Sequence, residues 1–208
     1  ELSYYRRLLH GRMDLLAFEQ RRRTGEETRS IIEALPEILA GSDAGAAALF
    51  GRLGMGRAHT IAGFLEALKI AHITGPLASG KIASMSCSGG EASLMADLAP
   101  PHGIAFPPLD QRQHAGLRAA LGPRVRLANP LDYNTYIWPD ADAMAATFTA
   151  MMQGDLALGV VVLDFPRADR CSDADWAAVI AAIERTRHAT SKPMAVLASM
   201  PENLSEQW

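Results

Sequence analysis

From residue 81 onward, short apolar runs alternate with stretches of helical periodicity, and this alternation restricts the fold more than any other feature of the chain. The run from Gly159 to Leu163 is continuous and rich in β-branched residues, which is typical of a strand covered on both faces. Strands are expected at 81–86, 158–164 and 194–199, with short extended pieces at 104–106 and 125–128. Helices are expected at 91–98, 110–121, 141–152 and 173–186. The alternation predicts an α/β domain with a parallel, doubly wound sheet of about four strands.

The first part of the chain has a different pattern, which is purely helical. Apolar residues at helical spacing predict one long helix over residues 1–23, broken at Thr24-Gly25, and a second helix over 26–39. Together they form a coiled-coil-like helical hairpin, which is too small to be stable without a partner. Three parts are therefore expected: the hairpin (1–39), a helical connector (40–80) with helices at 43–53 and 60–71, and the α/β part (81–208).

Bulk composition excludes several classes of protein. The 208 residues carry a net charge of −3, so bulk charge gives no reason to expect direct nucleic-acid binding. The two cysteines form neither a metal-binding spacing nor a disulfide framework, which predicts a cytoplasmic protein without a metal. No apolar run approaches the roughly 18–20 residues of a membrane span. The first residue, Glu1, and the polar last residues predict a fragment, truncated at its C-terminus.

A Ser-Gly-Gly turn between the first strand and its helix is the main candidate site. Glycines allow a ligand to approach the backbone, and a helix start offers unpaired N–H groups to an anion. A phosphate site and a plain strand-to-helix turn are both compatible with this pattern. Ser88 lies outside any G-x-S-x-G motif, so it is interpreted as a phosphate or backbone contact and not as a nucleophile. The candidate phosphate-binding residues are Ser86, Ser88, Gly89, Gly90 and Ser93.

Two further polar segments follow predicted strands. Ligands of such sheets lie beyond the carboxyl ends of the strands, so these segments are expected at the same edge as the turn. They are Asn129-Pro130-Leu131-Asp132-Tyr133 and the stretch from Asp164 to Arg170. Tyr133, Tyr136 and Trp138 either pack a long loop or line a pocket, and Cys87 is expected to be a buried, inert thiol.

The turn and the Asn-Pro-Leu-Asp segment, with Leu39-Ala40-Gly41-Ser42-Asp43 before them, resemble the NDP-forming acyl-CoA synthetases over residues 39–205. The family has N-S-G-G-x-G-x-x-A-A-D, then N-P-x-D, in a flavodoxin-like ligase subdomain. The resemblance implies synthesis of acyl-CoA from an acid, CoA and ATP or another NTP with Mg. A phosphohistidine carries the phosphate, and the turn receives it. Asn129, Pro130 and Asp132 would then form the loop on the substrate and CoA side.

The chain departs from this family in ways that matter for activity. Leu35 stands where the family has its phosphorylated histidine, and leucine cannot carry phosphate. Ala92 replaces the third glycine of the turn, and Glu91 before it weakens an anion site by charge repulsion. The ATP-grasp and CoA-binding domains are missing from this sequence, so they are the expected partners. The resemblance thus implies a fragment that is inactive alone and holds no catalytic residue.

Residues 1–40 show a second resemblance, to the RsiG-type anti-sigma proteins, which bind cyclic di-GMP through E-x3-S-x2-R-x3-Q-x3-D. Ser3, Arg6 and Asp14 match this motif, and His10 stands in the place of the glutamine. The spacing puts these side chains on one stripe of a helix, where a solvated charged face is the alternative. A cyclic di-GMP site and a sigma-factor partner are implied.

Three functions stay open from the sequence. The first is a fragment of an acyl-CoA synthetase, and the second is a cyclic di-GMP-responsive, anti-sigma-type binding module carried by the N-terminal helices. The third is a structural flavodoxin-like domain that contacts other subunits. A fused gene would explain why two resemblances meet near Leu39.

Overall fold

The computed structural model describes residues 13, 16–30, 32–34, 51, 54, 56–167 and 169–204. The chain divides into two compact units, Glu1–Lys69 and Ile70–Trp208, each of which is described by itself. The division into parts ending at residues 39 and 80 stays a prediction.

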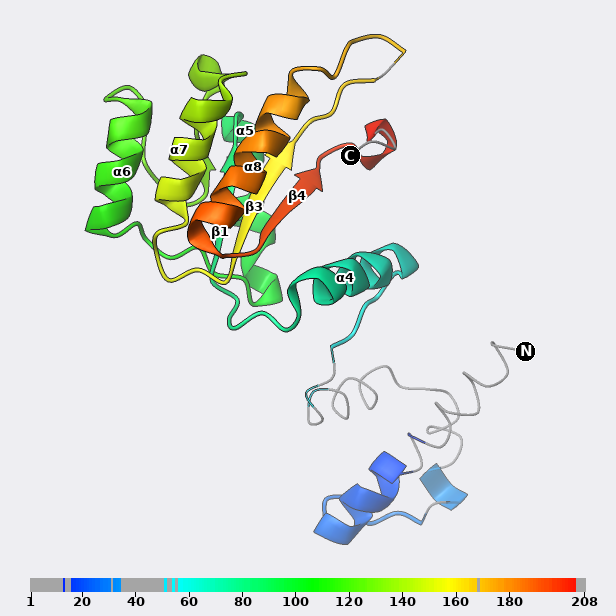
Figure 1. Ribbon diagram of the computed structural model, residues 1–208. Helices are drawn as coiled ribbons and strands as arrows, with labels where there is room; N and C mark the ends of the chain where they lie inside the picture. Colours follow the sequence, from blue (N-terminus) through cyan, green and yellow to red (C-terminus); the bar gives the residue numbers. More distant parts are fainter. Residues whose placement is uncertain are drawn as a thin grey trace. The chain divides into compact units, whose positions relative to one another are not determined.

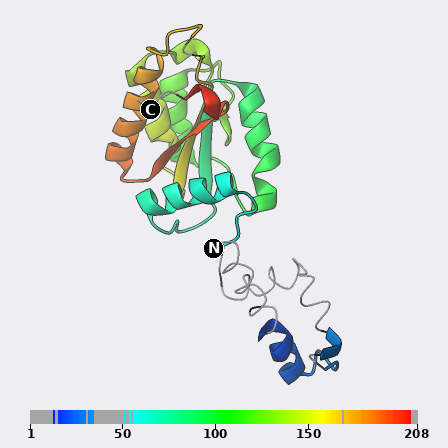
Figure 2. The ribbon, with the colours of Figure 1, turned by 90° about the vertical axis from the view of Figure 1, so that its right-hand side faces the viewer.

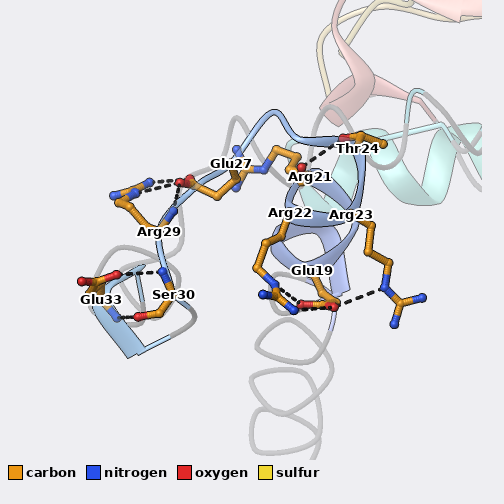
Figure 3. A network of polar contacts seen from close by, with 9 residues as sticks. All are labelled: Glu19, Arg21, Arg22, Arg23, Thr24, Glu27, Arg29, Ser30 and Glu33. Atoms are coloured by element: carbon orange, nitrogen blue, oxygen red, sulfur yellow. Dashed lines mark hydrogen bonds and ion pairs between the residues drawn. The ribbon is translucent and has the colours of Figure 1, made fainter.

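In the N-terminal unit, the described residues form a helix that ends at a turn and a second helical segment that follows it. Gly25 ends the first helix with a φ of 80°, which confirms the expected break. Glu19 pairs with Arg22 and Arg23 in the last turns of this helix, as Figure 3 shows. Phe18 and Ala34 are buried against each other. The remainder of the expected hairpin and the helix expected at 43–53 lie largely outside the described residues.

The expected start of the second helix at residue 26 is wrong, because residues 26–30 are not helical. The helical segment begins after Ser30, where two reciprocal hydrogen bonds form a capping box (Figure 3). The Ser30 N–H donates to the Glu33 carboxylate at 2.7 Å, and the Glu33 N–H donates to the Ser30 hydroxyl at 3.3 Å. Glu27 pairs with Arg29 at 2.8 Å instead of continuing a helix.

Helix α4 (Ile61–Thr74) matches the helix expected at 60–71. Its first turn is capped by Thr60, whose hydroxyl accepts a hydrogen bond from the Gly63 N–H at 3.0 Å. Gly75 follows its end with a φ of 68°. Within the described residues, no helix combines the length and the apolar character needed to cross a membrane.

The second unit contains the predicted parallel sheet, with four strands in the order β2-β1-β3-β4. Figure 1 labels β1, β3 and β4. All three pairs of neighbouring strands are parallel, so the α/β prediction is confirmed. The strands are β1 (Ile82–Ser86), β2 (Leu131–Asp132), β3 (Leu158–Leu163) and β4 (Met194–Ala198). The extended piece expected at 104–106 contributes a single bridge, between Ala105 and Lys81.

Helices cover both faces of this sheet. Helices α6 (Gln111–Leu121), α7 (Ala141–Met151) and α8 (Trp176–Thr190) lie side by side on one face, and α5 (Gly89–Leu98) lies on the other (Figures 1 and 2). Single-turn 3₁₀ helices occur at η1 (Pro100–His102), η2 (Thr135–Ile137) and η3 (Pro201–Asn203). This arrangement matches a flavodoxin-like, layered α/β fold.

Two hydrophobic clusters occupy the two faces, as the alternation of side chains along a strand requires. On β3, Val161 and Leu163 belong to the larger cluster, which α6, α7 and α8 cover. Val160 and Val162 belong to the smaller cluster, which Met95 of α5 and the 104–106 segment cover.

Caps determine where the helices of this unit begin. Asp110 and Gln113 form a capping box at α6, and Asp140 accepts two backbone N–H groups at α7. Helix α8 was expected from residue 173 and begins at Trp176. The preceding residues form tight i→i+3 turns, in which the Trp176 N–H donates to the Asp173 carbonyl at 3.0 Å.

Candidate functional site

The carboxyl ends of the four strands bring the predicted polar segments to one edge of the sheet. Cys87, Tyr133, Asp164 and Ser199 follow β1, β2, β3 and β4 in turn. Ser86 is paired in register with Asp132. The expected convergence of the three segments on this edge is therefore confirmed, while the role of each residue stays a prediction.

Helix α5 presents unpaired backbone donors at this edge. Ser88 is its N-cap and has an extended backbone, but its side chain makes no capping hydrogen bond. The first helical hydrogen bond runs from the Ala92 N–H to the Ser88 carbonyl at 3.1 Å. Within the described part of the chain, the N–H groups of Gly89, Gly90 and Glu91 have no partner, and both glycines are exposed. This geometry can bind an anion.

Two of the predicted serines shape this turn from inside. The buried Ser86 hydroxyl donates to the Ser88 carbonyl at 2.9 Å, which folds the turn back on the end of β1. The Ser93 hydroxyl donates to the Gly89 carbonyl at 2.8 Å, one helical turn earlier. Both hydroxyl hydrogens are used within the chain, whereas the Ser88 side chain has no hydrogen bond to the residues that the structure describes.

Asn129 completes the hydrogen bonding of β1 on the side of β2. Its side-chain amide donates to the Ile82 carbonyl at 2.9 Å and accepts from the Ser84 N–H at 3.2 Å, as a neighbouring peptide group in a parallel ladder would do. At the carboxyl end of the same edge, the Ser86 carbonyl accepts from the Tyr133 N–H at 2.9 Å. Asn129 therefore holds the loop against β1, and a cis peptide bond joins it to Pro130.

Asp132 lies against the start of α5. One of its carboxylate oxygens accepts the Asn134 N–H at 2.9 Å. The other lies 3.2 Å from the position that a Cβ atom on Gly89 would occupy, so glycine permits the close approach. A carboxylate at a helix N-terminus interacts favourably with the helix dipole. Asp132 thus shares the positive end of α5 with any anion that binds there.

Carboxylates dominate the electrostatics around Cys87. Burial, with Asp164 and Glu91 nearby, raises the pKa of the Cys87 thiol to about 11. Burial and Asp164 also raise the pKa of Glu91, and a hydrogen bond from Ser199 acts the other way. Because deprotonation is disfavoured, the Cys87 side chain is a neutral thiol at neutral pH, as expected.

Of the three aromatic residues in the β2–α7 connection, two pack against other aromatic rings and one is exposed. The Tyr133 ring is fully buried and meets Phe148 edge-on, and its hydroxyl has no hydrogen-bond partner among the residues that the structure describes. Trp138 makes an edge-on contact with Trp176, whose centroid lies 5.2 Å away. Tyr136 is exposed. The packing interpretation therefore holds for Tyr133 and Trp138.

Several of the predicted site residues lie outside the residues that the structure describes, and the described residues form no metal site. Ser3, Arg6, His10 and Asp14 lie outside the described residues, as does Leu35. In the described ranges, no group of three or more His, Cys, Asp or Glu side chains is arranged to hold a metal ion. After β3, Asp169 forms ion pairs with Arg167 at 2.8 Å and Arg170 at 3.5 Å.

Beside α5 lies a cavity that the sequence did not predict. It has a volume of about 350 Å³ and includes Gly89, Asn129, Pro130 and Asp132 in its walls. Arg124 and Arg126 also line it. Their alternation with the apolar Val125 and Leu127 was a signal that could have indicated a charged wall.

Comparisons with known proteins show similarities for the two parts of the chain separately. A family model described as RsiG-like matches residues 1–39. The chain matches PH0766 from Pyrococcus horikoshii OT3 with a TM-score of 0.59 and 22% identity, over 77% of this chain and 36% of that one.

The dinucleotide-forming acetyl-coenzyme A synthetase 1 of Ca. Korarchaeum cryptofilum is similar in two states. Its apo form gives a TM-score of 0.61 at 17% identity, over 76% of this chain and 34% of the synthetase. Its complex with phosphate and ADP gives 0.60 at 16% identity, over 80% and 36%. No curated protein matches the chain.

The chain thus spans about a third of the length of these solved structures. At identities of 16–22%, these similarities establish a shared fold alone. Both resemblances found in the sequence are confirmed at that level: the α/β part has the fold of a part of an acetyl-CoA synthetase, and residues 1–39 are similar to RsiG-like proteins.

Proposed function

We propose that residues 39–205 are a ligase subdomain of an NDP-forming acyl-CoA synthetase, which receives a phosphoryl group at the start of α5. The observation that carries this proposal is the set of unpaired N–H groups at Gly89, Gly90 and Glu91. They lie at the carboxyl edge of a parallel sheet whose fold is shared with an acetyl-CoA synthetase.

Each residue of the site has a distinct role in this proposal. The backbone N–H groups of Gly89 and Gly90 and the Ser88 hydroxyl bind the phosphoryl oxygens, and helix α5 adds its dipole. Ser86 and Ser93 maintain the turn through the hydrogen bonds described above. Asn129 and Pro130 position the loop that places Asp132 on the CoA and substrate side.

The carboxylates nearby suit a site that releases its anion readily. Glu91 lies in the first turn of α5, and Asp164 lies close enough to raise the pKa of Glu91. Both carboxylates repel a phosphoryl group. A site that passes phosphate between two partners benefits from weak binding, because tight binding of the intermediate state slows its release.

The complete enzyme would require CoA and ATP or another NTP with Mg, supplied by ATP-grasp and CoA-binding domains, and would act in the cytoplasm. The synthetase of similar fold was solved with phosphate and ADP, which supports a nucleotide in such an assembly. This chain alone should not form acyl-CoA, because Leu35 replaces the phosphorylated histidine. Incubation with γ-labelled ATP should leave no acid-labile label on the chain, and stoichiometric labelling would contradict this.

The phosphate site is tested by thermal unfolding with added inorganic phosphate. A ligand that binds the folded state raises its melting temperature. Phosphate should stabilise the natural chain and not Gly90→Val, whose side chain covers the approach to the turn. A Cβ on Gly90 would meet nothing closer than the Ser88 hydroxyl at 3.5 Å, so the variant should fold. The control Cys171→Ser, at an exposed residue, should respond as the natural chain does. Equal stabilisation of Gly90→Val would contradict the proposal.

A second candidate function rests on the RsiG-like match over residues 1–39. We propose that the N-terminal segment binds cyclic di-GMP, or a sigma factor in response to it, through Ser3, Arg6, His10 and Asp14. Calorimetry with cyclic di-GMP should show binding that Arg6→Ala abolishes and the matched neighbour Arg7→Ala preserves. Absence of binding to the natural chain would refute this function and leave the first one untouched.

A further inference from the structure

The cavity of about 350 Å³ beside α5 has one polar, basic wall and one small-residue wall. Ala92 and Ala96 of α5 form the small-residue wall. The opposite wall is the connection between α6 and β2, and it includes Arg124 and Arg126. The volume lies within the range of roughly 300–1,000 Å³ that small-molecule sites occupy.

Both arginines line the cavity, on either side of Val125, which also contributes to its wall. Val125 is buried, and Leu127 packs against the same large cluster. Arg124 and Arg126 are exposed, and the structure gives neither guanidinium a hydrogen-bond or ion-pair partner among the described residues.

Fixed hydrogen bonds hold this basic wall in place at both ends. The Arg118 guanidinium donates to the carbonyls of Gly122 and Val125, the second at 3.1 Å, which anchors the turn after α6. At the other end, the Asn129 amide binds the backbone of β1. The two free guanidinium groups are therefore presented from a backbone that is already ordered, which lowers the entropic cost of binding.

The charges and the shape of the cavity indicate the ligand. Guanidinium groups recognise phosphoryl groups through paired hydrogen bonds. The cavity holds one carboxylate, Asp132, which already accepts the Asn134 N–H, so the two arginines leave a net positive wall. The volume exceeds the needs of a phosphate ion, and the alanines offer a flat apolar surface to a base.

We propose that this cavity binds a nucleoside phosphate, with its phosphoryl group held by Arg124 and Arg126 and its base against Ala92 and Ala96. The cavity adjoins the start of α5 through Gly89, while Gly90 and Ser88 of the proposed phosphate site do not line it. It adds a nucleotide-binding role to the α/β unit itself.

Calorimetry with AMP and GMP on the full chain tests the site. Both nucleotides should bind. Adenosine, which lacks the phosphoryl group, serves as the control and should not bind. The double variant Arg124→Ala/Arg126→Ala should weaken nucleotide binding at least tenfold. Arg112→Ala, at an exposed arginine in a different groove, should bind as the natural chain does. Replacement of both arginines by lysine should restore part of the affinity, because charge returns without the paired donors.

The outcomes separate this inference from the proposed function. Absence of binding by both nucleotides, or equal binding by the double alanine variant, would overturn it. Inorganic phosphate should still stabilise the double variant, because the α5 turn is unchanged. Gly90→Val should lose the response to inorganic phosphate and keep nucleotide binding. If phosphate fails on the natural chain while AMP binds it, the proposed function fails and this inference stands.

Discussion

The strongest structural prediction concerns Asn129, whose side-chain amide stands in for a strand residue beside β1. Asn129→Ala removes both hydrogen bonds and leaves the Ser84 N–H and the Ile82 carbonyl without partners. Each unpaired backbone group costs about 1–3 kcal/mol, and the partly buried position of these groups favours about 1–1.5 kcal/mol for each. The expected loss of unfolding free energy is therefore about 2–3 kcal/mol. For a unit of this size, that lowers the melting temperature by roughly 5–10 °C.

The assay is urea unfolding followed by tryptophan fluorescence, because Trp138 and Trp176 report on the α/β unit. Asn129→Asp provides a graded control. Its carboxylate still accepts from the Ser84 N–H, but it has no hydrogen to donate to the Ile82 carbonyl, so two acceptor oxygens face each other. This repulsion raises the pKa of the new carboxyl above that of the unfolded chain. The variant should thus regain stability as the pH falls, when the protonated acid donates to Ile82. A loss below about 0.5 kcal/mol for Asn129→Ala would refute the argument.

Three further predictions test packing, charge and thiol chemistry. Gly116→Ala should destabilise the α/β unit by about 1 kcal/mol in urea unfolding. The new Cβ would lie 2.8 Å from the Cβ of Ala150 on α7, and this steric cost exceeds the gain in helix propensity. A stabilised variant would contradict this. Burial and Asp164 raise the pKa of Glu91, so its contribution to stability is present at low pH and is lost as the pH rises through the folded-state pKa. Glu91→Gln should therefore gain stability relative to the natural chain as the pH increases from about 4 to 8, and a constant difference would argue against the raised pKa of Glu91. An aromatic disulfide reagent should label the exposed Cys171 quickly and the half-buried Cys87 slowly, since partial burial and nearby carboxylates raise the pKa of Cys87 to about 11. Equal rates in peptide mapping would speak against the raised pKa of Cys87.

The sequence predicted the α/β unit well because several local signals agreed there. The run from Gly159 to Leu163 is β3 and is buried throughout, as its composition indicated. The boundary errors arose where a short polar segment competes with helix periodicity. The capping box of Ser30 and Glu33 begins the second helical segment later than its apolar pattern suggested.

The candidate site was harder to predict, because its details depend on contacts between distant residues. Asn129 was interpreted as a ligand contact, and its amide is used by the backbone of β1. A polar residue that binds the chain and one that binds a ligand look alike in a sequence. The influence of Asp164 on Glu91 depends on the strand order, which places the ends of β1 and β3 together. Strand order follows from the folded arrangement and is not written in local spacing.

One edge of β1 is hydrogen-bonded by the Asn129 side chain and by β2, and this has a consequence for how the α/β unit folds. Its hydrogen bonds to Asn129 join residues 45 and 47 positions apart, and β3, on its other side, is more distant still. Such a strand gains nothing from a local hairpin, because every partner requires the closure of a long loop. Folding should therefore be limited by the search for these distant contacts and proceed more slowly than the formation of the surrounding helices. Once formed, the amide hydrogens of Ile82 and Ser84 should exchange with solvent together, through opening of the whole unit rather than through fraying.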